Sequence, residues 1–166
     1  MTKRISEVIQ QQNFKNEYQK AYLTLLYVSN QVYAGHQDYF KKYKITQTQY
    51  NTLRILRGQY PVPCNANVIK DRMLDRNSDV SRLVQRLHKT GLLSLERNSE
   101  DKRNLEILIT PSGLELLEKI DQKIEQLEHP FNLLDEQEAA SLVSLLEKLI
   151  IWIRKVKYWS QELRVF

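Results

Sequence analysis

The sequence predicts a mainly α-helical protein with one small β-hairpin, and three features near its middle support this prediction. Within residues 77–90, apolar residues recur at the i, i+3, i+4, i+7 spacing of one helix face, namely Val80, Leu83, Val84 and Leu87. Gly91 follows where a residue of positive φ commonly ends a helix. Residues 93–97 and 105–109 then alternate at strand period on either side of a charged loop. Helix, turn, strand, loop and strand is the layout of a winged helix, with the loop as its wing.

The N-terminal part of the chain predicts one long helix over residues 13–42, which contains no proline. Its apolar stripe consists of Phe14, Tyr18, Tyr22, Leu25, Val32 and Phe40. A helix of this length in a small domain must bury its stripe against another element. Because the helix precedes the winged-helix segment, we expect it to be free to pack on a second subunit.

A shorter helix is predicted after this long one. Thr46 and Gln49 form a capping box, which starts a helix that ends near Gly58. Its candidate core residues are Tyr50, Leu53, Ile55 and Leu56. The proline-rich residues 61–64 then force an extended connection.

The next short helix is expected over about residues 66–74, before the helix of residues 77–90. Its candidate core residues are Val68, Ile69, Met73 and Leu74. Residues 75–77 form the turn between the two helices, and Asn77 suits the N-cap position of the second. Two short helices joined by a turn of three or four residues have the spacing of a helix-turn-helix.

Two further helices are predicted after the hairpin. Thr110 as N-cap and Pro111 at the first helical position start a helix that reaches about Glu128. Its apolar residues are Leu114, Leu117, Ile120, Ile124 and Leu127. Pro130 interrupts the chain, and a capping box at residues 135–138 starts the last helix. The apolar stripe of that helix is Leu142, Leu145, Leu146, Leu149, Ile150, Ile153 and Val156.

The face of the 77–90 helix opposite its leucines carries cationic and hydrogen-bonding side chains. They are Ser78, Ser81, Arg82, Gln85, Arg86 and Lys89. In the major groove, arginine can bind guanine through two hydrogen bonds, glutamine can bind adenine, and serine can bind either. The same side chains also suit phosphate oxygens. The alternative is an ordinary solvated face, but the helix-turn-helix spacing and the charged loop beyond it favour a DNA-reading helix.

Residues 75–113 closely resemble the core of the MarR family of bacterial transcription regulators. The wing signature of that family, Asp, one residue and Arg, is met by residues 101–103. The family pattern that follows the wing, Leu-Thr, two residues and then Gly, appears at residues 109–113 with Ile109 in the place of the leucine. Residues 45–56 resemble the helix that precedes the helix-turn-helix. The resemblance covers roughly residues 18–149, and it implies a dimer in which the first long helix joins the C-terminal helices at the interface.

Asp101 and Arg103 are two residues apart, so in an extended hairpin they project to the same side. The carboxylate can hold the guanidinium of Arg103, or that of Arg86, in a fixed pose. The resemblance implies that Arg103 enters the minor groove of DNA. Lys102 stands where many family members have another arginine, and it keeps the charge but loses the fork geometry. The candidate DNA-binding residues are therefore Asn77, Ser78, Ser81, Arg82, Gln85, Arg86, Lys89, Asp101, Lys102 and Arg103.

The last helix carries more apolar surface than a monomer of this size with a small sheet can cover. We therefore expect its stripe and that of the first long helix to close on a second copy of the chain. Packing of both stripes on the chain's own core is the alternative. We interpret residues 1–166 as a single winged-helix DNA-binding domain, with dimerisation helices at 13–42 and 111–160 and a winged helix-turn-helix at 45–110.

Composition and motif content argue against several classes of protein. The net charge of +5 permits an anionic partner, and residues 76–103 hold seven basic against four acidic residues. A single cysteine rules out an intramolecular disulfide and a cysteine-rich zinc site. The scattered glycines and histidines match no phosphate loop, metal site or catalytic constellation, so we expect no enzyme, cofactor or metal. The N-terminus has no secretory apolar core and the longest apolar run is short, so we expect a cytoplasmic protein without a membrane partner.

The predicted function is transcription regulation by a homodimer that binds a pseudo-palindromic DNA operator through sequence-specific contacts. The alternative is a winged-helix protein-interaction module without DNA binding, which acidic neutralisation of the recognition face would favour. The resemblance also implies possible release by a small aromatic or phenolic effector, or by an oxidant.

Two further features bear on such an effector or oxidant. Tyrosines that can line an effector cleft are Tyr18, Tyr22, Tyr33, Tyr39, Tyr43 and Tyr50, although aromatic stripes at helical spacing more often belong to a core. Cys64 lies in the proline-rich loop, whereas the peroxide-sensing branch of the family carries its cysteine near the first helix. We therefore interpret Cys64 as structural or incidental.

Overall fold

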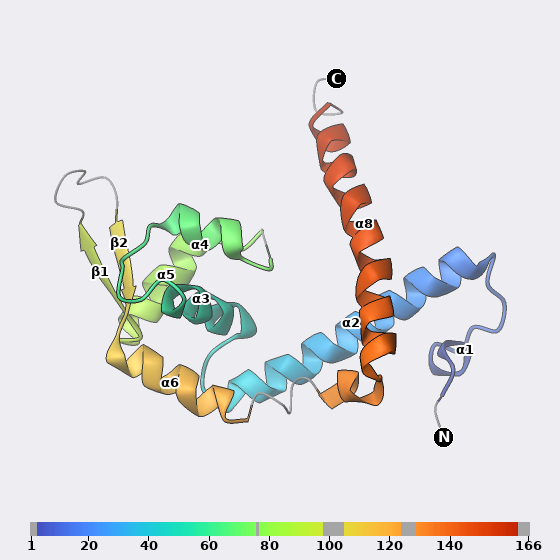
Figure 1. Ribbon diagram of the computed structural model, residues 1–166, viewed down its shortest axis with the longest axis horizontal. Helices are drawn as coiled ribbons and strands as arrows, with labels where there is room; N and C mark the ends of the chain where they lie inside the picture. Colours follow the sequence, from blue (N-terminus) through green and yellow to red (C-terminus); the bar gives the residue numbers. More distant parts are fainter. Residues whose placement is uncertain (1–2, 76, 98–104, 124–128, 163–166) are drawn as a thin grey trace. The chain divides into compact units, whose positions relative to one another are not determined.

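The chain forms two compact units, residues 1–127 and residues 128–166. A computed structural model describes residues 3–75, 77–97, 105–123 and 129–162, with the backbone alone beyond residue 151. The first unit contains α1 (Ile5–Val8), α2 (Glu17–Lys41), α3 (Gln47–Arg57), α4 (Ala66–Arg72), α5 (Val80–Lys89), β1 (Leu93–Arg97), β2 (Leu105–Ile109) and α6 (Pro111–Asp121) (Figure 1). The second contains the 3-10 helix η1 (His129–Leu133) and α8 (Glu136–Glu162). The predicted mainly helical fold with a two-stranded antiparallel hairpin is confirmed.

The first two long elements begin at side-chain caps. α2 starts after Asn16, whose side-chain oxygen accepts a hydrogen bond from the Gln19 backbone N–H at 2.9 Å. The predicted start near residue 13 was too early, because Asn16 itself is fully extended. The predicted capping box of α3 is confirmed: the Gln49 N–H donates to Thr46 Oγ1 at 3.1 Å, and the Thr46 N–H donates to Gln49 Oε1 at 2.8 Å.

The turn between α4 and α5 differs from the prediction. Met73 has an extended backbone, so successive side chains there point to opposite sides and do not follow the helical spacing. Met73 is buried and Leu74 is 84% exposed, and the predicted burial of Leu74 was therefore wrong. Asn77 as N-cap was also wrong. The Asp75 carboxylate accepts from the Asn77 N–H at 2.9 Å, which keeps that residue in the turn, and α5 starts later with Asp79 as its cap.

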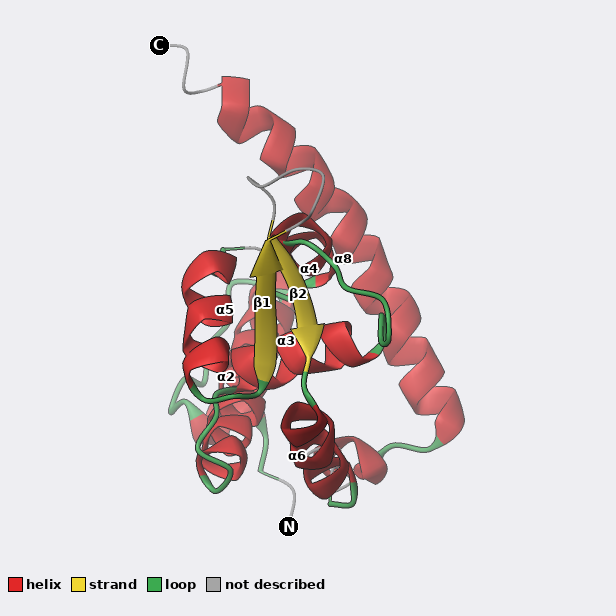
Figure 2. Ribbon diagram, turned by 90° about the vertical axis from the view of Figure 1, so that its left-hand side faces the viewer, coloured by secondary structure: helices red, strands yellow, loops and turns green. Residues whose placement is uncertain are grey.

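The hairpin is held by the turn that precedes it, by the pairing of its two strands and by a bridge from another segment. Gly91 has φ 74°, which confirms the predicted helix-ending residue. The strands pair in the register Leu93 with Ile109, and Figure 2 shows them side by side with α5 next to β1. A further antiparallel bridge joins Cys64 to Ile107, so the loop between α3 and α4 extends the sheet by one backbone pair.

The core of the first unit lies between the hairpin and its helices. Its fully buried members include Phe40, Leu53, Leu56, Ile69, Leu87, Leu93, Ile107, Ile109, Leu117 and Ile120. Gly113, in the first turn of α6, is buried against the hairpin base, where a Cβ would overlap the Leu92 carbonyl oxygen and the Ile109 side chain. The predicted start of α6, with Thr110 as N-cap and Pro111 first, is confirmed.

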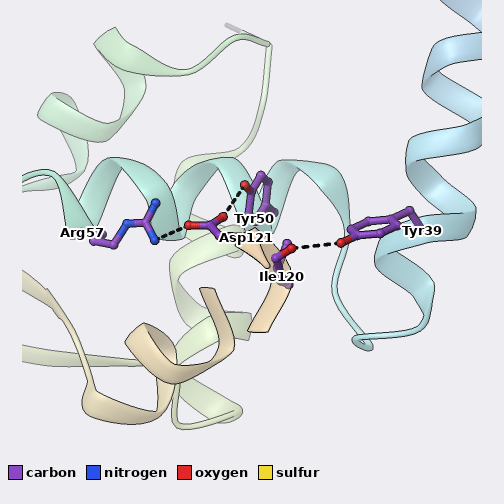
Figure 3. Close-up of polar contacts among 5 residues, drawn as sticks. All are labelled: Tyr39, Tyr50, Arg57, Ile120 and Asp121. Carbon is purple, nitrogen blue, oxygen red and sulfur yellow. Dashed lines mark hydrogen bonds and ion pairs between the residues drawn. The ribbon is translucent and has the colours of Figure 1, made fainter. Parts of the chain in front are cut away.

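Three polar contacts fasten the end of α6 to α2 and α3 (Figure 3). The Tyr39 hydroxyl donates to the Ile120 carbonyl oxygen at 3.0 Å, and the Tyr50 hydroxyl donates to Asp121 Oδ1 at 3.0 Å. Arg57 Nη1 lies 2.6 Å from Asp121 Oδ2. Burial, and then the Asp121 carboxylate, raise the pKa of Tyr50 to about 12. One carboxylate thus holds two side chains of α3 at the C-terminal end of α6.

α6 ends at Asp121, so the predicted extension to about Glu128 was wrong. The Lys123 N–H donates to the Ile120 carbonyl oxygen at 3.0 Å, and this tight turn closes the helix. Ile124 and Leu127, which were expected to belong to this helix, lie outside the described residues.

The second unit contains the last predicted helix. Its capping box is confirmed, with the Glu138 N–H donating to Asp135 Oδ1 at 2.8 Å and the Asp135 N–H donating to Glu138 Oε2 at 3.0 Å. Large apolar side chains of α8 are exposed, namely Val143, Leu145, Leu149, Ile150 and Ile151. None of the helices in the described residues combines the length and apolar character needed to cross a membrane.

Candidate nucleic-acid interface

α5 presents opposite faces to the core and to solvent. Val80, Val84 and Leu87 are buried, because the apolar residues follow the helical period that the sequence predicts. The opposite face consists of exposed side chains, namely Ser81, Arg82, Gln85, Arg86 and Lys89. Five of the predicted contact residues therefore lie together on one accessible helix face. Such a face offers cations for phosphates and fork-shaped or amide groups for base edges.

The first turn of that face is held by Asp79. Its Oδ1 accepts a hydrogen bond from the Arg82 backbone N–H at 3.1 Å, which caps the helix. Its Oδ2 lies 3.1 Å from Nε of Arg82, whose side chain is 80% exposed. The sequence prediction included Arg82 but missed Asp79, although an acidic residue three positions before an arginine at a helix start is a recognisable local signal.

Two predicted contact residues lie in the turn rather than on the helix face. Ser78 is half-buried, and its hydroxyl donates to Asp75 Oδ2 at 3.0 Å. Asn77 is exposed, with its backbone N–H bound to the same carboxylate. Both precede Val80, so the regular spacing that placed Ser78 on the α5 face does not apply to it.

The wing residues Asp101, Lys102 and Arg103 lie outside the described residues. The strands that lead to them are described. β1 ends at Arg97, which is exposed, and β2 begins at Leu105. Arg97 is thus a further accessible cation at the base of the wing, and the strand alternation gave no sign that it differs from an ordinary surface residue.

A cavity of about 700 Å³ lies beside the N-terminal half of α5. It is lined by the C-terminal half of α2, the α2–α3 connection and the first turn of α3, and by Ser78, Asp79, Arg82, Leu83 and Arg86. Lys41 and Lys44 add two cations to those of Arg82 and Arg86, and Asp79 is the acidic residue of the lining. The cavity is therefore electropositive.

Two residues that line this cavity have unusual features. Gln47 Oε1 is buried and has no hydrogen-bond partner within the described residues. Lys44 has φ 56°, an uncommon value for a residue other than glycine, and this turn brings the end of α2 to the start of α3. Of the six tyrosines that were cleft candidates, Tyr33 lines the cavity, whereas Tyr39 and Tyr50 belong to the core. The sequence did not reveal the cavity, because its cations come from separate elements.

Comparisons with known proteins agree with this geometry. A sequence model described as MarR family matches residues 43–104, the segment from the end of α2 into the wing. A crystal structure of a MarR transcription factor from Planctomyces limnophilus is 31% identical, with a TM-score of 0.63 over 84% of this chain and 99% of that one. The chain belongs to the MarR family.

Two other relatives extend the likeness. The HTH-type transcriptional regulator SarZ of Staphylococcus haemolyticus is 27% identical over 76% of this chain and 84% of its own length. The structure of Bordetella bronchiseptica BpsR, a protein whose DNA binding is regulated by 6-hydroxynicotinic acid, is 24% identical with a TM-score of 0.70 over 83% and 97% of the two chains. The second likeness supports the fold alone. MarR-family proteins are transcription regulators, a class that is generally not enzymatic.

Cys64 of this MarR-family protein is buried beside strand β2. It is 8% exposed, and its backbone N–H and carbonyl both pair with Ile107. Burial raises the pKa of its thiol, and the charge of Arg72 opposes that shift. A buried thiol with a raised pKa contains little of the reactive thiolate at neutral pH, which supports the structural interpretation.

Proposed function

We propose that this MarR-family protein is a sequence-specific DNA-binding transcription regulator that inserts α5 into the major groove. The accessible α5 face carries this proposal, because Arg82, Gln85 and Arg86 combine positive charge with groups that match base edges. The likeness to SarZ, an HTH-type transcriptional regulator, supports the same role by analogy. Acidic neutralisation of the face would favour a protein-interaction module, but here it is confined to the pair of Arg82 with the N-cap residue Asp79, and α5 itself carries no acidic residue.

The wing supplies the second contact in this proposal. β1 follows the C-terminal end of α5 and pairs with β2, and residues 98–104 connect the two strands. Arg103 would enter the neighbouring minor groove, where a narrow groove attracts arginine. Asp101 would orient Arg103 or Arg86, and Lys102 would contact phosphate. Asn77, Ser78, Ser81 and Lys89 would complete the interface with polar and phosphate contacts.

A homodimer is the proposed functional unit. Tyr18 and Tyr22 of α2 are 86% and 60% exposed, and α8 exposes a separate row of leucines and isoleucines. Two apolar helix faces of this kind mark a protein–protein contact more often than a free surface. Because a two-fold dimer presents two copies of α5, its operator would be a pseudo-palindrome with half-sites about 10–10.5 bp apart.

The electropositive cavity beside α5 is the proposed effector site. Its four cations suit a small anionic ligand, and Tyr33 and Leu83 give it apolar walls for an aromatic ring. The 6-hydroxynicotinic acid that regulates BpsR belongs to that chemical class. Arg82 and Arg86 line the cavity and also belong to the α5 face. A bound aromatic carboxylate would therefore compete with DNA for the same two arginines and release the operator.

DNA binding is tested by fluorescence anisotropy on a random duplex at several salt concentrations. The logarithm of the wild-type binding constant should fall linearly with the logarithm of the salt concentration, with a slope set by the number of phosphates that the protein neutralises. The combined substitution Arg82→Ala, Arg86→Ala and Lys89→Ala should reduce that slope by up to about three per subunit, if every side chain contacts a phosphate. Lys119→Ala is the matched control, since Lys119 is an exposed cation on α6. A triple variant that binds like the control would refute α5 as the DNA-contacting element.

A further inference from the structure

The carboxylate of Asp79 contacts one residue, Arg82, through both of its oxygens. Oδ1 accepts from the Arg82 backbone N–H at 3.1 Å, and Oδ2 lies 3.1 Å from the Arg82 guanidinium at Nε. Both side chains are largely exposed, at 56% for Asp79 and 80% for Arg82. An exposed ion pair of this kind contributes little to folding stability.

We propose that Asp79 is a positioning residue for base recognition, which fixes the Arg82 guanidinium in the pose that reads one base. This inference rests on the proposed DNA-binding function, and it adds a specificity-determining residue that makes no base contact itself. The ion pair approaches Arg82 from the Nε side. The two terminal nitrogens remain available for paired acceptors, such as O6 and N7 of guanine.

The two-oxygen geometry separates this role from simple capping. Asparagine and serine cap helices about as well as aspartate, because one side-chain oxygen is enough to accept the backbone N–H. Neither residue has a second anionic oxygen for the guanidinium. An amide that keeps the cap turns its NH₂ group toward Nε of Arg82, where two donors face each other. The Arg82 side chain is then free to adopt several rotamers, and ordering it on binding costs entropy.

The charge of Asp79 acts in the opposite direction on affinity. A carboxylate at the DNA-facing start of α5 repels phosphates whatever the sequence. Removing the charge should therefore strengthen binding to random DNA and weaken the preference for one base. A residue that only caps the helix would not move these two quantities in opposite directions.

Asp75 offers a matched control. Its carboxylate lies in the turn before α5 and binds the Asn77 N–H and the Ser78 hydroxyl, each within 3.0 Å. Asp75→Asn removes the same charge from the same region, and the amide oxygen of the asparagine can still accept the Asn77 N–H that holds the turn. We therefore expect the Asp79–Arg82 pair to remain, so that this variant reports the general electrostatic effect.

The experiment uses the full-length protein and anisotropy on the selected operator, on single-base variants and on random duplex. The base position that Arg82 reads is the one where Arg82→Ala loses preference. Wild-type discrimination there should be roughly 5- to 150-fold, the range of one bidentate contact. Asp79→Asn and Asp79→Ser should lower that factor about threefold or more, while Asp75→Asn leaves it unchanged. In the Arg82→Ala background, Asp79→Asn should have no further effect on preference. Thermal melting checks that all variants fold.

Each result has a definite meaning. Equal base preference in Asp79→Asn, Asp75→Asn and the wild type would overturn the inference and leave Asp79 as a helix cap. Equal loss in both asparagine variants would also overturn it, in favour of a general charge effect. Preference that Arg82→Ala leaves intact would remove Arg82 as a reader, and the inference with it. A wild-type protein that binds no duplex would instead refute the proposed function itself.

Discussion

Gly113 gives the sharpest stability prediction, because two glycines in helices of this protein should respond with opposite signs to the same substitution. A Cβ at Gly113 would overlap the Leu92 carbonyl oxygen and Ile109 Cγ1, the latter at 2.7 Å. The Leu92 oxygen cannot easily withdraw, since it accepts the Thr110 N–H at 3.2 Å at the base of the hairpin. At Gly35 in α2, a Cβ would meet nothing within 4 Å.

The magnitudes follow from packing and helix propensity. Overpacking a close contact of this kind costs about 1–3 kcal/mol, and the helix propensity of alanine returns at most about 1 kcal/mol. Because the nearest atom is a backbone oxygen, the overpacking cost lies toward the upper end of that range, so Gly113→Ala should lower the free energy of unfolding by about 1–2 kcal/mol. For a chain of this size, that corresponds to a melting temperature about 2–8 °C lower. Gly35→Ala should instead raise the free energy of unfolding by about 0.5–1 kcal/mol, because only the propensity term acts.

Differential scanning calorimetry at a fixed protein concentration measures both variants against the wild type. The concentration must be constant, because any dimerisation couples to unfolding. A Gly113→Ala protein that melts at or above the temperature of Gly35→Ala would refute the reasoning. It would mean that α6 moves away from the hairpin without loss, and that the close contact is not a constraint on the fold.

Four further predictions concern the interface, the dimer, the thiol and the core. Arg82→Ala should weaken operator binding by about 1–3 kcal/mol and relax the preference at one base position. Arg103→Ala should instead weaken binding to many sequences and lower the salt slope by about one per subunit. Anisotropy on operator and random DNA separates the two effects, and equal weakening on both DNAs by Arg82→Ala would make Arg82 a phosphate anchor. Sedimentation at micromolar concentration should give twice the chain mass, and removal of the residues after Leu149, part of the exposed α8 row, should weaken association; a stable wild-type monomer would contradict the dimer. Cys64→Ser should bind operator with unchanged affinity with or without peroxide, because the thiol is buried and its pKa is raised; loss of a peroxide response in that variant would identify Cys64 as a sensor. The pKa of Tyr50 is raised from 10.0 to about 12, so the contribution of the neutral Tyr50 hydroxyl to the free energy of unfolding is complete below pH 10 and is lost as the pH rises toward 12. In chemical denaturation, the free energy of unfolding of Tyr50→Phe should fall less steeply with pH over that window than that of the wild type. Identical pH slopes for the two proteins would refute the assignment.

The local features of the fold were determined by the sequence itself. The capping boxes at Thr46 and Asp135, the Thr110 cap and the Gly91 turn all appear in the structure as predicted. These signals depend on side chains and backbone groups a few residues apart, so no distant contact is needed to form them. The periodicity of α5 likewise determined which of its faces is buried.

The folded structure decided which of two neighbouring caps starts α5, and only tertiary packing decided the features that depend on distant segments. Asn77 is as good a cap as Asp79, but the Asp75 carboxylate holds Asn77 in the turn and leaves Asp79 to start α5. The cavity brings Lys41 and Lys44 to the arginines of α5, and no local pattern relates residues so far apart in the chain. In the sequence Gly113 only ends the pattern that follows the wing, and its contact with the hairpin base shows why a glycine is needed there. Sequence periodicity indicates which face of an element is buried, whereas the packing of elements determines which side chains meet.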